Sequence, residues 1–163
     1  MEVVEGFADI DDVGAFVADL DEIGERHGLT VQAFDARYVV DRGHLERAVE
    51  LAERTRERGD TIADDFGVEI LLYAAGRRQI NRALAMGVSE GACPVVAVLV
   101  GDGDTAAAGT ALSELLTPGE TLGDYDADRV REFFDVSDTE LAATEGTLAD
   151  AVRERVALLP VEK

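Results

Sequence analysis

Apolar and polar positions along the chain predict strands and helices that alternate. Short apolar or alternating runs, typical of strands, occupy residues 2–8, 29–34, 68–75 and 94–100, and the first run is expected at a sheet edge. Apolar residues recur at helical spacing in residues 13–27, 43–59, 80–87 and 106–116, and again in 128–134, after Ser137 and in 147–159. We expect one α+β domain over residues 1–163, a mixed β-sheet of about four strands covered by helices, with a helical C-terminal segment.

The stretch from Glu69 to Gly87 carries the candidate chemistry. Its apolar part, Val68–Ala75, is predicted as a buried strand because it is too short for a typical helix, contains an aromatic residue and ends at Gly76. A short helix follows from Ile80. The turn 76–79 would then lie between a strand end and a helix N-terminus, where free backbone amides and the helix dipole favour an anion.

Charge marks the same stretch. The chain has 35 acidic residues among 163, yet residues 70–89 contain none and carry three arginines. Arg77 and Arg78 at a helix N-terminus would oppose the dipole, and a bound phosphate or carboxylate would resolve that conflict. The alternative is that both arginines pair with acids elsewhere on this acidic surface.

The residues from Glu69 to Leu84, followed by Gly87-Val88, resemble the signature of the small KEOPS subunit of the Cgi/TPRKB family. That signature is a Glu, an apolar strand, a small residue, Gly-x-Arg-Gln-Ile, a short helix and a Gly-Val or Gly-Ile step. Gly43-His44-Leu45 is similar to the family's second helix, and residues 154–159 are similar to its C-terminal helix. The likeness therefore covers most of the chain in the same order.

The resemblance implies a function. Members of this family are non-catalytic subunits of KEOPS, the complex that installs threonylcarbamoyl on the adenosine next to the anticodon of certain tRNAs. They bind the PRPK-type kinase subunit and hold the single-stranded CCA end of the tRNA. Guanidinium groups stack on bases or fork onto phosphates, and a glutamine amide reads a base edge. The implied RNA-binding residues are Arg77, Arg78 and Gln79, with Gly76 allowing close approach and Asn81 and Arg82 secondary.

The kinase contact is expected on an apolar helical surface. In the C-terminal helix, Val152, Val156 and Leu159 form such a stripe. The same stripe serves equally well as ordinary core.

Composition adds a salt adaptation. The net charge is -20, and the basic residues are fourteen arginines and a single lysine. This combination is typical of a halophilic archaeon, whose proteins stay soluble in a salty cytoplasm. At molar salt the Debye length is about 3 Å, so an acidic surface does not exclude RNA binding through directed hydrogen bonds.

The chain lacks the residue patterns of an enzyme. Its two histidines lie near helix ends, no serine has a nucleophile elbow, and no His, Cys and acid spacing resembles a zinc site. We expect no catalytic residue, no metal and no cofactor. An alternative is a small α/β enzyme or ligand-binding domain that uses the Gly101–Thr105 loop, although its two aspartates would repel phosphate. A third possibility is an adaptor that binds the kinase but no RNA.

The N-terminus and the lone cysteine bear on location. Cys93 lies in an apolar run and fits a reducing interior. Residues after Met1 show no signal-peptide pattern, and no apolar stretch approaches the length of a membrane span. We therefore expect a cytoplasmic protein that does not enter a membrane.

Overall fold

The computed structural model describes residues 1–143 and 146–162, with side chains up to residue 159. It contains a four-stranded sheet in the order β2-β3-β1-β4. The strands are β1 (Glu2–Ile10), β2 (Thr30–Asp35), β3 (Gly91–Val100) and β4 (Thr117–Pro118). The α+β class and the four-stranded sheet are confirmed. The predicted mixture of strand directions is not found, because each pair in this sheet is antiparallel.

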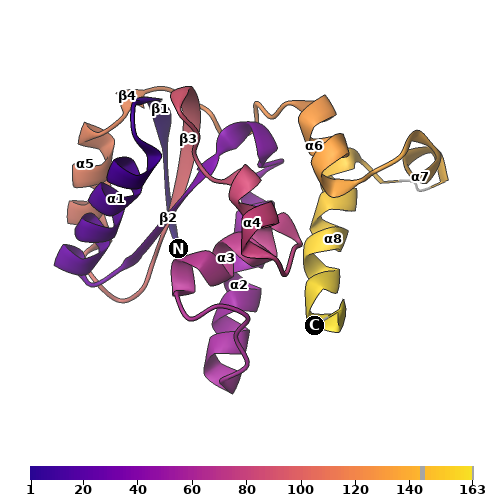
Figure 1. Ribbon diagram of the computed structural model, residues 1–163, viewed down its shortest axis with the longest axis horizontal. Coiled ribbons are helices and arrows are strands. Elements are labelled where there is room, and N and C mark those ends of the chain that lie inside the picture. Colours follow the sequence, from indigo (N-terminus) through magenta and orange to yellow (C-terminus); the bar gives the residue numbers. More distant parts are fainter. Residues whose placement is uncertain (144–145, 163) are drawn as a thin grey trace.

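Helices cover both faces of the sheet (Figure 1). On one face lie α1 (Val13–His27) and α5 (Thr105–Glu114), and on the other lie α2 (Arg42–Arg58), α3 (Phe66–Ala75) and α8 (Leu148–Glu162). The shorter elements are η1 (Ala36–Tyr38), α4 (Ile80–Ala83), η2 (Leu84–Met86), α6 (Ala127–Phe134) and α7 (Asp138–Ala143). No helix in the described part of the chain is long and apolar enough to cross a membrane.

The alternating residues of β3 separate two apolar cores. Val96 and Val98 face the core formed with α2, α3 and α8, while Val95 and Ala97 face the core formed with α1 and α5. A strand buried on both faces needs an apolar residue at every position, which explains the continuous apolar run in its sequence. β1 lies between β3 and the two-residue β4, so the prediction that it is a sheet edge holds only beyond the short pairing with β4.

The predicted strand at residues 68–75 is wrong, because this segment belongs to helix α3. Asp65 caps its N-terminus, with the Val68 N–H donating to the Asp65 carboxylate at 3.0 Å. Nearly every side chain of α3 is buried, so the helix shows no polar face in the sequence. Periodicity alone cannot separate such a helix from a buried strand. The fourth strand of the sheet is the short β4 instead.

Glu69 links α3 to the loop before it. Its carboxylate is fully buried and accepts hydrogen bonds from the Thr55 hydroxyl at 2.8 Å, the Ile62 N–H at 2.9 Å and the Ala63 N–H at 2.8 Å. A buried carboxylate is costly unless such donors satisfy it. Glu69 therefore fixes the end of α2 and the loop 59–65 against α3.

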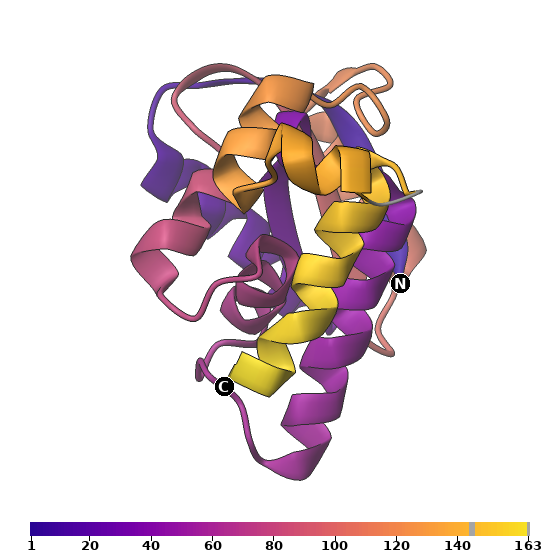
Figure 2. The ribbon, with the colours of Figure 1, turned by 90° about the vertical axis from the view of Figure 1, so that its right-hand side faces the viewer.

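The C-terminal helix α8 lies along α2, as Figure 2 shows. Val152, Val156 and Leu159 are buried and belong to the core shared with α2 and α3. Arg153 pairs with Asp41, the N-cap residue of α2, so α8 is also held by an ion pair. The stripe predicted as a kinase contact is thus occupied within the chain, and α8 exposes Leu158, 41 % accessible, on its outer face.

Candidate nucleic-acid interface

The turn after α3 has a different geometry from the one predicted. Gly76 adopts the left-handed conformation with φ 61°, its N–H donates to Tyr73 O at 3.1 Å, and the Arg77 N–H donates to Leu72 O at 3.1 Å. Both amides are therefore used in capping α3. The first two amides of the turn are thus not free to bind an anion as predicted.

The charge of the turn also has a simpler explanation. Arg77 and Arg78 directly follow the C-terminus of α3, where the helix dipole is negative and cations are favourable. The helix that follows them, α4, has only four residues. The electrostatic conflict expected from a strand-to-helix turn does not arise here.

Gly76 faces α8. A Cβ at this position would lie 3.4 Å from the Arg155 backbone oxygen and would also be strained by the positive φ. The glycine is thus required by the cap and by the close approach of α8. The geometry gives no separate reason for a glycine here that involves RNA.

Arg77 points into the fold. It is half-buried, its Nη2 donates to Phe133 O, and its guanidinium carbon lies 5.3 Å from the centroid of the Phe133 ring. Its Nε is buried and has no hydrogen-bond partner in the described structure. Arg77 therefore fastens the turn to α6, through a carbonyl and a ring rather than an ion pair.

The next residues form an exposed surface, which we call the α4 face: Arg78, Gln79, Ile80, Asn81, Arg82 and Leu84. Gln79 is the N-cap residue of α4 but makes no capping bond with its side chain. Ile80 and Leu84 are 47 % and 57 % exposed, although both are apolar. The α4 face thus combines amide and guanidinium groups with apolar contact area, on a segment that contains no acid.

An apolar groove adjoins the α4 face. It has a volume of about 270 Å³ and is lined by residues of α1, β2, α3 and the segment after α4, among them Val13, Val17, Leu71, Leu84 and Val88. Leu84 belongs to both surfaces. The sequence offered no signal for this groove, since α1 and the segment 84–88 meet only through the fold.

His44 of α2 is hydrogen-bonded to the last turn of α3. Its ring is fully buried in α2, with Nε2 2.7 Å from Ala74 O and Nδ1 3.3 Å from the Val40 nitrogen. The Val40 N–H can only donate, so Nδ1 accepts and Nε2–H donates to Ala74 O. Burial lowers the pKa of His44 to about 4. The neutral imidazole thus joins the start of α2 to the last turn of α3.

The Gly101–Thr105 loop is closed by the chain itself. A Cβ at Gly103 would lie 1.9 Å from His27 O, and the Asp104 N–H donates to that same oxygen at 3.0 Å. The Asp104 carboxylate accepts from the Ala107 N–H and so caps α5. This geometry explains the two glycines by close backbone packing and argues against a ligand loop.

Acidic groups elsewhere form no metal centre that the structure shows. Within residues 1–143 and 146–162, no group of three or more His, Cys, Asp or Glu side chains could hold a metal ion. Asp126 in the acidic segment 123–128 accepts from the Asp128 and Arg129 N–H groups and caps α6.

Together, these features define a small α+β protein whose candidate site is an exposed face of amide, guanidinium and apolar groups beside a groove. Comparison with known families is more specific: the family model "Kinase binding protein CGI-121" matches residues 7–159. The chain therefore belongs to the CGI-121 family. A comparison with curated protein sequences gave no significant match.

The buried His44 predicts how stability depends on pH. Its folded-state pKa of about 4 lies below the ordinary value of 6.5, so between these values the unfolded chain binds more protons and stability falls as the pH is lowered. The free energy of unfolding should drop by about 3 kcal/mol from this group between pH 7 and pH 4. Urea unfolding at several pH values, compared with H44Q, measures the difference.

The H44Q variant should lose this contribution, so its stability relative to wild type should improve as the pH falls. H27Q, at a half-buried site at the end of α1, controls for the removal of a histidine as such. A difference between wild type and H44Q that stays constant with pH would contradict the assignment.

Proposed function

We propose that this protein is a non-catalytic subunit of the KEOPS complex, which binds the PRPK-type kinase subunit and holds the CCA end of the tRNA. The observation that carries the proposal is the match of the kinase-binding CGI-121 family over residues 7–159. The resemblance of the segment 69–88 to the Cgi/TPRKB signature supports it. We place the protein in the cytoplasm of a halophilic archaeon, because an arginine-rich, strongly acidic chain suits high salt.

The α4 face is our candidate for the RNA contact. Arg78, Gln79, Asn81 and Arg82 are exposed and lie where no carboxylate of the segment 70–89 opposes a phosphate. In molar salt, affinity must come from hydrogen bonds and stacking rather than from a basic field. The arginine and glutamine side chains supply the hydrogen bonds. The exposed Ile80 and Leu84 offer apolar area for contact with bases.

The roles of two residues change with the geometry. Arg77 donates to Phe133 O, so we assign it the task of positioning the turn rather than that of a primary RNA contact. Gly76 caps α3 and accommodates α8. The direct contacts are assigned to Arg78 and Gln79, with Asn81 and Arg82 beside them.

The outer face of α8 is our candidate for the kinase contact. Val152, Val156 and Leu159 are buried in this chain, so a partner that docks on α8 would meet Glu154 and Leu158. Subunit interfaces usually have an apolar centre, and Leu158 supplies one on this helix.

RNA binding should depend on the CCA end. In molar potassium chloride, full-length tRNA should bind at least about 10-fold more tightly than tRNA trimmed of its CCA end, since each stacked base contributes about 1–3 kcal/mol. Q79A and R82A should each weaken binding of full-length tRNA by about 5- to 30-fold. Fluorescence anisotropy measures these affinities.

R54A is the matched control, because Arg54 is exposed on α2 and pairs with Glu50. It should bind tRNA as the wild type does. Equal or absent binding of trimmed and full-length tRNA would remove the RNA role and leave an adaptor that binds the kinase alone.

Kinase binding should be direct and survive high salt. The protein and the PRPK-type kinase subunit should co-elute from a gel-filtration column in molar potassium chloride, because an apolar interface is not screened. L158E should weaken the complex at least about 10-fold, while L115E, at another exposed leucine, should not. Separate elution of the wild-type proteins would contradict the partnership.

A further inference from the structure

A small pocket lies between η1 and α6. It has a volume of about 260 Å³ and is lined by Tyr38, Arg129, Glu132 and Phe133. The Tyr38 and Phe133 rings meet edge to face, with centroids 5.5 Å apart, and both are only half-buried. A pocket of this size suits a single planar ring rather than a drug-sized ligand.

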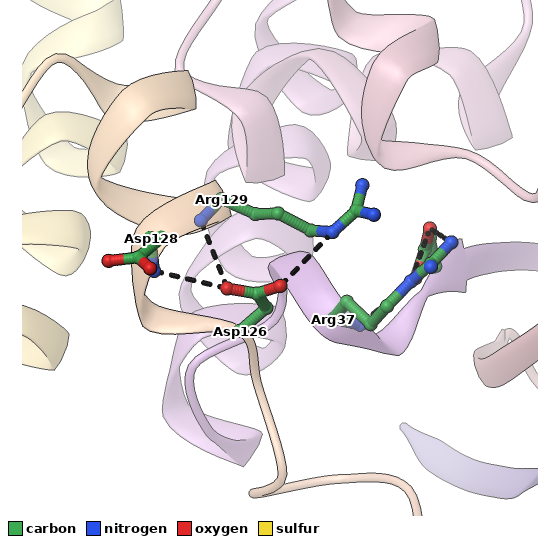
Figure 3. Close-up of polar contacts among 5 residues, drawn as sticks. Arg37, Asp126, Asp128 and Arg129 are labelled. Atoms are coloured by element: carbon green, nitrogen blue, oxygen red, sulfur yellow. Dashed lines mark hydrogen bonds and ion pairs between the residues drawn. The ribbon is translucent and has the colours of Figure 1, made fainter.

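Arg129, which lines the pocket, and Arg37, the chain neighbour of Tyr38, are engaged to different degrees. Arg37 donates from Nε at 3.0 Å and from Nη2 at 2.7 Å to the buried Asp35, so its guanidinium is committed to that carboxylate. Arg129 donates through Nε alone to Asp126, at 3.2 Å. Figure 3 shows that the two outer nitrogens of the Arg129 guanidinium group point away from Asp126. Arg129 also lines the pocket, so we take its outer nitrogens as the donors that it offers to a ligand.

Contacts of Arg77 connect this pocket to the α4 face. The Arg77 guanidinium lies over the Phe133 ring, and its Nη2 donates to Phe133 O. Phe133 in turn lines the pocket. The backbone also ties the two walls together, since the Asp126 N–H donates to Arg37 O at 2.9 Å. The α4 face and the pocket are thus joined through one pair of residues, Arg77 and Phe133.

The charges of the lining select the kind of ligand. Arg129 and Glu132 bring one positive and one negative group to the same pocket. A phosphate or carboxylate would be repelled by Glu132, whereas a neutral base has an edge with both donors and acceptors. Aromatic rings are the surfaces on which single-stranded bases stack. The lining therefore fits a nucleobase.

We propose that the Tyr38–Phe133 pocket receives one further base of the same single strand, next to the CCA end held by the α4 face. This inference rests on the proposed RNA function. The base would stack on the Tyr38 ring beside the Phe133 ring, Arg129 would donate to its acceptor atoms, and Glu132 would accept from its amino group.

The test compares two single-stranded RNAs in molar potassium chloride, the trinucleotide CCA and a strand of about six nucleotides that ends in CCA. Wild-type protein should bind the longer strand about 10-fold more tightly. R129Q and Y38L should remove this advantage and leave the affinity for the trinucleotide unchanged. R54Q is the control for R129Q, and Y38F, which keeps the ring, should bind like wild type.

Stacking of the further base can be measured separately by fluorescence. A 2-aminopurine placed directly before the CCA should lose fluorescence on binding to wild type and to Y38F, but not to Y38L. If wild type binds both RNAs equally well, or the fluorescence does not change, the pocket inference is overturned while the CCA site stands. If wild type binds neither RNA, the proposed function fails and this inference fails with it.

Discussion

The structure depends on a central helix, α3, that is buried on nearly all sides. Two side chains tie its polar groups to neighbouring segments. The Glu69 carboxylate accepts from the Thr55 hydroxyl and from the Ile62 and Ala63 N–H groups, and the His44 ring donates to Ala74 O. Because an unsatisfied buried polar group costs about 1–3 kcal/mol, these contacts hold α3 against α2 and the loop before it.

The position of α3 determines the candidate interface. His44 and the Gly76 cap fix its C-terminus, and Arg77 joins the following turn to Phe133 of α6. The residues beyond Arg77 then face solvent as the α4 face. The segment before the α4 face is fixed by His44, Arg77 and α8. The protein therefore loses little conformational freedom when it binds a flexible single strand.

The sequence predicted the elements that have a polar side and clear ends. Helices α1, α2 and α5 show apolar spacing and begin after a capping aspartate, and all three are confirmed. It failed at α3, whose uniform burial removes the helical period, although Asp65 and Gly76 at its two ends were available signals. In the candidate site, the exposure of Asn81 and Arg82 follows the helical spacing of the sequence. The same spacing favours burial of Ile80 and Leu84, and both are exposed in the structure. The inward turn of Arg77 depends on α6, more than fifty residues away, and no local pattern encodes it.

The most direct test of this account is hydrogen–deuterium exchange in molar potassium chloride, measured on the protein alone, with tRNA and with the kinase subunit. We expect tRNA to slow exchange of the backbone amides in residues 78–86, and the kinase to leave them unchanged. Slowed exchange confined to other segments, such as the Gly101–Thr105 loop, would contradict the claim that the α4 face binds RNA.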